Sequence, residues 1–231
     1  MSVLPGEGPL VLVLDVDSTL IQDEVIELIA DHAGTREEVA AVTEAAMRGE
    51  LDFAGSLHAR VATLEGLPVE VLEQVRATVR LTPGARTLVT TLVENGHVVG
   101  LVSGGFLEVV APLAEELGIE TVRANSLEIV DGRLTGRVSG EVVDRAAKAE
   151  FITRLAASAG VETDRTVAVG DGANDLDMMA AARLGIAFCA KPAVREQADV
   201  AIDERDLRRV LDVLRIEPLP QDDDEGGQPL A

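Results

Sequence analysis

The sequence has 231 residues, a formal net charge of −21 at pH 7, 47% hydrophobic residues and only 2% aromatic residues. The negative charge opposes binding to nucleic acid and to anionic lipid, and the scarcity of aromatic side chains argues against recognition of single-stranded nucleic acid by stacking. The one cysteine, Cys189, excludes an internal disulfide and a cysteine-based zinc site.

The first predicted element is the apolar run at residues 10–14, which is typical of a short strand buried on both faces of a parallel sheet. After it, Thr35 and Glu38 have the spacing of a capping box at the start of a helix, and Pro83 would terminate the last helix of this stretch. We expect helices, and no strand, at residues 25–33, 36–49, 52–66 and 68–81. We therefore interpret residues 23–81 as a helical cap domain inserted after the first strand.

Strands and helices alternate from residue 82 onward, which indicates an α/β fold with a parallel sheet. Asp131 and Gly132 predict the turn of a small β-hairpin within residues 124–143. We expect a Rossmann-like three-layer core from residues 1–22 and 82–216, and a disordered acidic tail at residues 217–231. The other expected strands lie at residues 97–105, 166–172 and 186–190, and the expected helices at 84–96, 106–118, 146–160, 176–185 and 203–215.

Polar clusters follow three of the predicted strands. They are DVDST at residues 15–19, SGG at 103–105 and GDGAND at 170–175. The carboxyl ends of parallel strands meet at one edge of a sheet, and ligands of open α/β sheets bind there. We therefore expect the three clusters to form one site.

Asp15 and Asp17 can point the same way if strand geometry continues beyond residue 14. A plain turn in which Asp15 caps the following helix is an alternative. A calcium loop of the EF-hand type is excluded, because its sixth and twelfth positions would be Leu20 and Ile26 instead of Gly and Glu.

The cluster GDGAND also approaches the dinucleotide fingerprint G-x-G-x-x-G, but its last position is Asp175, an acid that would oppose a pyrophosphate. No Walker A sequence is present. The acids suit a magnesium site better, because Mg²⁺ binds few carboxylates and shares phosphate oxygens with a substrate. The candidate residues for this site are Asp15, Asp17, Asp171 and Asp175.

Phosphoryl transfer also needs groups that neutralise the phosphate oxygens. The hydroxyl of Ser103 and the backbone N–H of Gly104 can donate hydrogen bonds. Lys148, which with Lys191 makes up all the lysine in the sequence, can supply a positive charge. Taken alone, Lys148 is more often explained as a solvated surface lysine.

The motifs DVDST, SGG, Lys148 and GDGAND occur in the order found in the haloacid dehalogenase-like phosphatases. Longer stretches resemble the bacterial phosphoserine phosphatases within that group: DVDSTLIQDE, SLHARV, LVSGGF, GDGANDLDMM and IAFCAKP. The resemblance extends over residues 11–214. It implies hydrolysis of O-phospho-L-serine to L-serine and phosphate, the last step of serine biosynthesis.

The resemblance also implies a role for each acid. Asp15 would be the nucleophile that forms an aspartyl-phosphate, and Asp17 would protonate the departing serine oxygen and then activate water. One Mg²⁺ per chain would be bound by the Asp15 carboxylate, the backbone carbonyl of Asp17 and Asp171, with Asp175 behind these ligands. Asn174 and Lys148 would steady the phosphate and the nucleophile, and Ser103 and Gly104 would also bind the phosphate.

The same resemblance assigns substrate selection to the cap. Glu24 would bind the ammonium group of the substrate and Arg60 its carboxylate. Met47 and Phe53 would close over the substrate and exclude water. From the residues alone, Glu24 can also be explained as an acid that stabilises a helix N-terminus.

The alternative activity is that of a phosphatase or phosphotransferase of the same fold that acts on another small phosphorylated amino acid or phosphomonoester. As partner we expect phosphoserine, with no nucleic acid and no membrane, and a chain that is a monomer or a homodimer. Residues 1–10 show no signal-peptide pattern, and no apolar run approaches the roughly 18 residues of a membrane span. We therefore expect a cytoplasmic protein.

Overall fold

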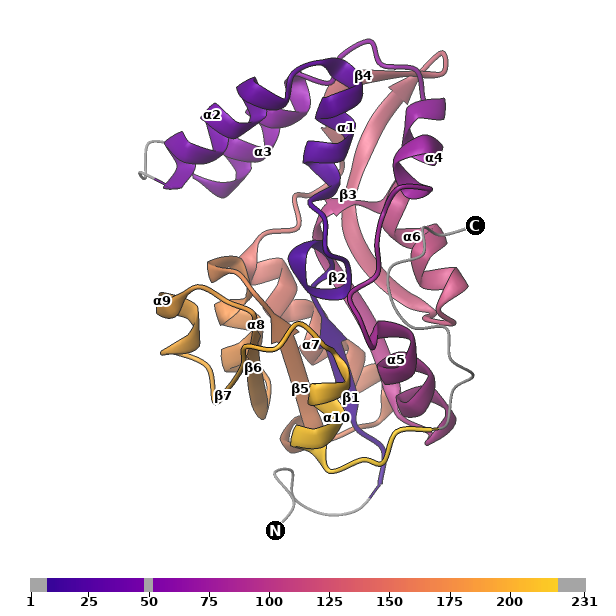
Figure 1. Ribbon diagram of the computed structural model, residues 1–231, viewed down its shortest axis with the longest axis vertical. Coiled ribbons are helices and arrows are strands. Elements are labelled where there is room, and N and C mark those ends of the chain that lie inside the picture. The colour runs from indigo at the N-terminus through magenta and orange to yellow at the C-terminus, as the bar shows by residue number, and fades with distance from the viewer. Residues whose placement is uncertain (1–7, 48–51, 220–231) are drawn as a thin grey trace.

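The structure is a computed structural model that describes residues 8–47 and 52–219. The predicted helix end at Gly49, and residues 220–231 of the predicted disordered tail, lie outside the described residues. Figure 1 shows helices packed around a central sheet, with a further group of helices beyond one end of its strands.

A seven-stranded sheet with the order β4-β3-β2-β1-β5-β6-β7 forms the centre of the described part of the chain. Neighbouring strands of this sheet run parallel, except for β3 and β4, which form the predicted hairpin. The predicted α/β class and parallel sheet are therefore confirmed. The strands are β1 (Val11–Leu14), β2 (Val98–Phe106), β3 (Thr121–Val130), β4 (Arg133–Ser139), β5 (Thr166–Gly170), β6 (Leu184–Phe188) and β7 (Val200–Ile202).

Helices bury both faces of the sheet. Successive side chains of β1 point to opposite faces, so Leu12 and Leu14 join one hydrophobic core while Val11 and Val13 join the other. The continuous apolar run at residues 10–14 results from this burial on both sides. The first face is covered by α5 (Ala85–Glu94), α6 (Leu107–Glu116) and α10 (Arg208–Leu214), and the second by α7 (Arg145–Ala159) and α8 (Leu176–Ala181).

The segment between β1 and α5 is helical, as predicted, and we call residues 23–81 the helical insertion. Its two connections to the sheet pair with each other. Ile21 forms a β-bridge with Leu81, and the N–H of Gln22 donates to the carbonyl of Arg80 over 2.9 Å. The insertion contains α1 (Val25–Ala33), α2 (Arg36–Met47), α3 (Phe53–Ala62) and α4 (Glu70–Arg76).

Some local predictions are wrong. Thr35 does not complete a capping box, because its hydroxyl oxygen is buried without a hydrogen-bond partner among the described residues. Pro68 does not begin a helix. It forms a β-bridge with Arg133 of β4, and α4 runs only from Glu70 to Arg76.

One β-strand and one α-helix of the described residues escape prediction from the sequence. They are β7, with three residues, and α9 (Pro192–Arg195), with four. Neither is long enough to show a periodic pattern. No helix in the described ranges is long and apolar enough to cross a membrane.

Candidate active site

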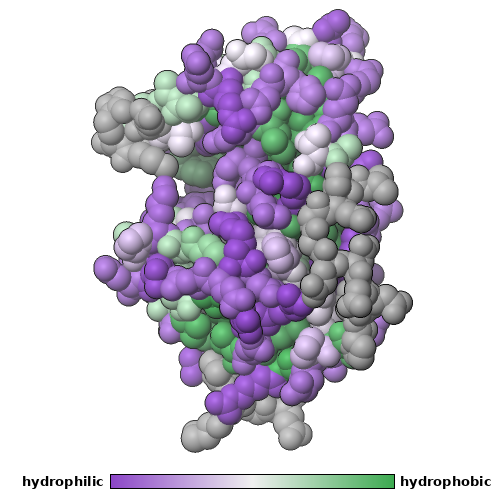
Figure 2. Space-filling view, viewed as in Figure 1, coloured by the Kyte–Doolittle hydropathy of each residue, from purple (hydrophilic) through white to green (hydrophobic). Residues whose placement is uncertain are grey.

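The carboxyl ends of β1, β2 and β5 lie side by side, because these strands are parallel neighbours in the middle of the sheet. Asp15 directly follows β1, Asp171 directly follows β5, and Ser103 lies near the end of β2. The three polar clusters therefore meet at one edge, as predicted. Figure 2 shows the molecular surface indented between the helices α2–α3 of the insertion and the region of α8 and α9.

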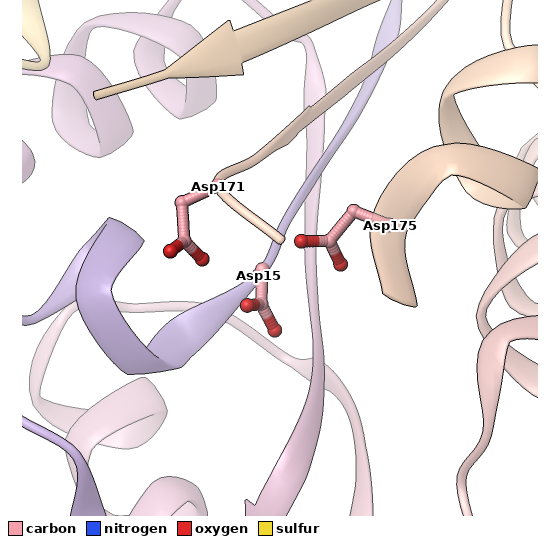
Figure 3. A group of neighbouring side chains, drawn as sticks. All are labelled: Asp15, Asp171 and Asp175. Atoms are coloured by element: carbon pink, nitrogen blue, oxygen red, sulfur yellow. The ribbon is translucent and has the colours of Figure 1, made fainter. Parts of the chain in front are cut away.

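Three carboxylates point toward one another at this edge (Figure 3). An oxygen from each of Asp15, Asp171 and Asp175 lies within 4.8 Å of the others. Oxygen donors with this much negative charge suit a hard divalent cation, which carboxylates bind in preference to softer metals. These residues could therefore hold a metal ion.

Both carboxylate oxygens of Asp175 accept hydrogen bonds. Oδ1 accepts from Nζ of Lys148 over 2.7 Å, and Oδ2 accepts from the N–H of Gly172 over 3.0 Å. The side chain can lie this close to β5 because Gly170 has no side chain: a β-carbon there would be 2.7 Å from Cβ of Asp175. These contacts favour a position for Asp175 behind the metal ligands.

Lys148 is fully buried, and its Nζ lies 2.6 Å from Oδ1 of Asp15. It projects from α7, which packs close to the sheet over Gly100 of β2. A β-carbon at Gly100 would be 2.5 Å from a methyl group of Leu155 on α7. The interpretation of Lys148 as a solvated surface lysine is therefore wrong.

Burial and crowding perturb the acids of the site. Burial raises the pKa of Asp15 well above its ordinary value, repulsion from Asp175 adds to this, and Lys148 opposes it. Burial, followed by repulsion from Asp175 and Glu24, raises the pKa of Asp171 to about 7. One buried ammonium does not balance this many carboxylates, so a further cation would stabilise their ionised forms.

A wide turn, η1 (Val16–Leu20), follows Asp15. In it the N–H of Leu20 donates to the carbonyl of Asp15 over 3.3 Å. The Asp15 side chain accepts no capping hydrogen bond at the start of this turn. The alternative in which Asp15 merely caps a helix is therefore wrong.

Asp17 lies within that turn and connects it to the insertion. Its Oδ1 accepts from the N–H of Val25, the first residue of α1, over 2.9 Å, and its Oδ2 accepts from Oγ of Ser103 over 3.5 Å. Burial, followed by repulsion from Glu24, raises the pKa of Asp17 to about 7. A carboxyl group with this pKa can both give and accept a proton near neutral pH.

The end of β2 forms a second wall of the site. Ser103 is fully buried, and its hydroxyl accepts from the N–H of Gly105 over 2.8 Å. The side-chain amide of Asn125 donates to the carbonyl of Gly104 over 2.8 Å. Its amide oxygen accepts from the N–H of Val143 over 2.8 Å, so Asn125 fixes the SGG segment against the chain that leads into α7.

Glu24 and Arg60 belong to the helical insertion. Glu24 is the residue before α1, and its Oε1 accepts from the hydroxyl of Ser18 over 2.6 Å. Burial raises the pKa of Glu24 and lowers that of Arg60, while each favours the charged form of the other. Arg60 is also attracted by Asp17, so the cationic and acidic groups of the insertion lie within electrostatic range of the sheet edge.

Of the three remaining predicted site residues, the structure describes the side chains of two. The ring of Phe53, at the start of α3, lies 3.2 Å from where a β-carbon on Gly104 would be. The side-chain oxygen of Asn174 folds over Gly172, where any β-carbon would collide with it. Met47 ends α2, but its side chain lies outside what the structure describes.

Sequence reasoning missed three groups that support the site: the hydroxyl of Ser18, the N–H of Val25 and the side chain of Asn125. Asn125 gave little signal, because four other polar residues lie in the same strand, namely Thr121, Arg123, Ser126 and Glu128. The contacts of Ser18 and Val25 depend on the path of the turn, which the residue pattern does not reveal.

Comparisons with known proteins give a consistent result. The family model described as haloacid dehalogenase-like hydrolase matches residues 12–180. A phosphoserine phosphatase of Streptomyces coelicolor is 64% identical over 205 residues, which are 89% of this chain and 50% of that protein. The chain thus spans about half the length of that relative. A phosphoserine phosphatase of Streptococcus thermophilus is 53% identical over 88% of this chain and 94% of its own length.

The fold is similar to that of solved structures as well. One of them, a phospho-aspartyl intermediate analogue of phosphoserine phosphatase, aligns with a TM-score of 0.84 at 44% identity. The alignment covers 90% of this chain and 100% of that one.

Proposed function

Because the chain belongs to the haloacid dehalogenase-like hydrolase family, we propose that it hydrolyses O-phospho-L-serine to L-serine and phosphate. The observation that supports this most directly is Asp15, whose Oδ1 is held 2.6 Å from the buried ammonium of Lys148 at the edge of the sheet. A carboxylate fixed in this way, with Asp17 beside it, has the features of a nucleophile for an aspartyl-phosphate mechanism.

In the first step, the Asp15 carboxylate attacks phosphorus, and the bond from phosphorus to the serine oxygen breaks. The electron pair of that bond goes to the serine oxygen, which takes the proton of Asp17 and leaves as L-serine. Asp17 suits this task because its pKa is raised to about 7, so that much of it is protonated near neutral pH.

In the second step, the now ionised Asp17 removes a proton from water as the water oxygen attacks the aspartyl-phosphate. The bond from phosphorus to the Asp15 oxygen breaks, phosphate leaves, and both aspartates return to their starting forms. Lys148 stays beside Asp15 throughout and offsets the repulsion between this carboxylate and the phosphate.

The metal implied by the family fits the residues present, since the three facing carboxylates supply only oxygen atoms. We propose one Mg²⁺ per chain, held by the carboxylates of Asp15 and Asp171 and the backbone carbonyl of Asp17. Asp175 would stay behind these ligands, since both its oxygens are engaged. When bound, Mg²⁺ would neutralise negative charge at the phosphate.

Selection of the substrate would come from the helical insertion. We assign the ammonium group to Glu24 and the carboxylate to Arg60, and we assign the exclusion of water to Phe53 and Met47. Ser103, the N–H of Gly104, Asn174 and Lys148 would bind phosphate oxygens. We further propose that residues 23–81 act as a cap on a core of residues 1–22 and 82–216.

The wider setting of this activity is proposed on the family resemblance alone. The reaction would be the last step of serine biosynthesis, it would take place in the cytoplasm, and the chain would act as a monomer or a homodimer. Phosphoserine would be its partner, with neither nucleic acid nor membrane, which the net charge of −21 disfavours.

The test is phosphate release from O-phospho-L-serine by the purified chain, with Mg²⁺ and with a chelator. Phosphothreonine, phosphohomoserine and small phosphomonoesters without an amino-acid group are assayed in parallel. We expect Mg²⁺-dependent release with the highest kcat/KM for phosphoserine. A higher kcat/KM for another member of the panel would assign the site to that substrate, and the absence of release from every member would refute a phosphatase.

A further inference from the structure

We propose that Gly136, in the β3–β4 hairpin, positions the helix that bears Arg60 and so sets the preference of the site for the amino-acid end of its substrate. This inference rests on the proposed function, in which Arg60 binds the substrate carboxylate. Gly136 touches no substrate in this scheme. It acts as a positioning residue through its contact with α3.

The contact between Gly136 and α3 leaves no room for a side chain. A β-carbon at Gly136 would lie 3.0 Å from Cβ of Glu65, 3.2 Å from the carbonyl oxygen of Ala62 and 3.3 Å from Cα of Ala62. Two of these three atoms belong to the backbone at the end of α3. A rotamer change therefore cannot relieve the contact, and the helix end itself would have to move.

The chain that follows α3 is bonded to the same strand. The N–H of Gly66 donates to the carbonyl of Leu134 over 2.8 Å, and the N–H of Leu134 donates to the carbonyl of Leu67 over 2.9 Å. Nη1 of Arg133 also donates to the carbonyl of Gly66 over 2.7 Å. These bonds hold the segment after α3 on β4, so the end of α3 lies against Gly136 and a larger residue there would press on it.

The hairpin is in turn anchored to the sheet layer. The pairing of β3 with β4 shifts register between Leu127 and Ile129, and at this irregularity the N–H of Leu127 donates to a carboxylate oxygen of Glu108 on α6 over 2.9 Å. The base of the hairpin thus belongs to the packed core. An enlarged residue at 136 would therefore displace α3 in preference to the hairpin.

Arg60 lies two residues before Ala62 and would follow any displacement of the helix end. Its Nε donates to the carbonyl of Ser56 over 3.3 Å, and its carbonyl accepts from the hydroxyl of Thr63 over 2.7 Å, so its base is integrated into the last turns of α3. The acids that act on phosphate, by contrast, follow β1 and β5. A shift of α3 should hence weaken recognition of the amino-acid group and spare the chemistry at phosphorus.

The test compares Gly136→Ala with Gly140→Ala. Both glycines have left-handed φ values, +74° and +79°, but an added β-carbon at Gly140 would meet nothing within 4 Å. The two variants share the backbone strain and differ in the contact with α3. For each, kcat and KM are measured with phosphoserine and with p-nitrophenyl phosphate, which has no carboxylate, and folding is followed by thermal unfolding.

We expect Gly136→Ala to raise KM for phosphoserine about tenfold, because a displaced arginine loses its bidentate geometry. Its kcat for phosphoserine and its kcat/KM for p-nitrophenyl phosphate should match those of Gly140→Ala. The substrate ratio is kcat/KM for phosphoserine divided by kcat/KM for p-nitrophenyl phosphate. The proposal would be overturned if Gly136→Ala and Gly140→Ala had the same substrate ratio. If Gly136→Ala does not fold, Arg133→Ala removes one bond between hairpin and insertion without adding an atom. A lowered ratio in that variant supports the proposal, and an unchanged ratio overturns it.

A double variant with Arg60→Ala identifies the route of the effect. If Gly136 acts through Arg60, adding Gly136→Ala to Arg60→Ala should leave the substrate ratio where Arg60→Ala alone placed it. The proposal would be overturned if Gly136→Ala lowered the substrate ratio by the same factor in Arg60→Ala as in the unaltered chain. Failure of the proposed function would be seen separately, as absence of phosphoserine hydrolysis by the unaltered chain.

Discussion

Nζ of Lys148 lies 2.6 Å from Oδ1 of Asp15, a residue 133 positions earlier in the chain. The same nitrogen lies 2.7 Å from Oδ1 of Asp175, and no part of Lys148 is exposed. Burial acts to lower the pKa of Lys148, but attraction to the two carboxylates outweighs it and holds the pKa above its ordinary value. Lys148 is therefore charged at neutral pH.

Replacement of Lys148 by Met keeps most of the length of the side chain and removes its charge. Two buried carboxylates would then face each other without a cation, and we expect a loss of about 3–5 kcal/mol in the free energy of unfolding. Urea unfolding in the presence of a chelator measures this loss of stability. The variant should also no longer release phosphate from phosphoserine. The matched control is Lys191→Met, at an exposed position, which should change neither quantity. Unaltered stability of Lys148→Met would contradict the role of the buried charge.

Asp15→Asn should abolish phosphate release while the chain stays folded, because the amide keeps the shape of the carboxylate but is not a nucleophile. We expect no label on the protein after acid quenching of a reaction with ³²P-labelled phosphoserine. Asp164→Asn, at an exposed position, is the control and should label and turn over as the unaltered chain does. Covalent label on Asp15→Asn would assign the nucleophile to another residue.

The acids of the site also predict how pH affects stability without metal. The pKa of Asp17, raised by burial and by Glu24, and that of Asp171, raised by burial and by Asp175, both reach about 7. Between the ordinary value of 3.8 and about 7, the folded state thus binds more protons at these groups than the unfolded state does. Their contribution to stability falls as pH rises through this window.

Thermal unfolding with and without Mg²⁺ tests this relationship. Since protons and Mg²⁺ compete for the same carboxylates, we expect Mg²⁺ to raise Tm more at pH 8 than at pH 6. Asp171→Asn should remove most of the rise at both values, whereas Asp164→Asn should keep it. A rise in Tm that does not depend on pH, or that survives Asp171→Asn, would exclude these acids as the metal site.

Arg60→Ala tests selection of the substrate. Loss of a charged partner for the substrate carboxylate should lower kcat/KM for phosphoserine about 100-fold, close to 3 kcal/mol, with little change for p-nitrophenyl phosphate. The control is Arg36→Ala, another arginine of the helical insertion, whose guanidinium is exposed and pairs with Glu27. Similar losses on both substrates would show that Arg60 supports the insertion and does not read the carboxylate.

The local pattern predicts those parts of the fold that depend on neighbouring residues. The helix expected at residues 25–33 matches α1 from Val25 to Ala33, because its apolar residues repeat along one face and Gly34 takes the left-handed conformation that ends it. The gathering of Asp15, Ser103 and Asp171 was also predictable, since parallel strands present their carboxyl ends at one edge.

Contacts between segments that are distant in the sequence cannot be predicted from such local patterns. The bond of Lys148 to Asp15 was suggested only by family resemblance, because periodicity does not show that a lysine is buried. The close approach of Gly136 to Ala62 leaves no trace in the residue spacing either. At Thr35 the local pattern instead predicts a contact that does not form. The spacing of Thr35 and Glu38 fits a capping box, but the buried hydroxyl of Thr35 forms no hydrogen bond to a described residue.

Gly170 offers a final test of the link between Asp175 and Lys148. An alanine at Gly170 would place its β-carbon 2.7 Å from Cβ of Asp175 and closer still to its carboxyl group, so it would push that carboxylate off Nζ of Lys148. In the neighbouring strand β6, an alanine at Gly185 would meet Cβ of Met179, also at 2.7 Å, and Met179 carries no charge. Both substitutions thus create a similar steric overlap with residues that follow the strand. Only the overlap at Gly170 involves an acidic residue of the site.

Both Gly170→Ala and Gly185→Ala should lose stability, by about 1–3 kcal/mol for an overpacked core. Only Gly170→Ala should also lose the Mg²⁺-dependent rise in Tm and most of kcat, since Lys148 would then neutralise Asp15 alone and the carboxylates would no longer face one another. Urea unfolding, Tm with Mg²⁺ and kcat measured on the same preparations separate these effects. If kcat falls equally in both variants, the position of Asp175 does not matter beyond its part in packing.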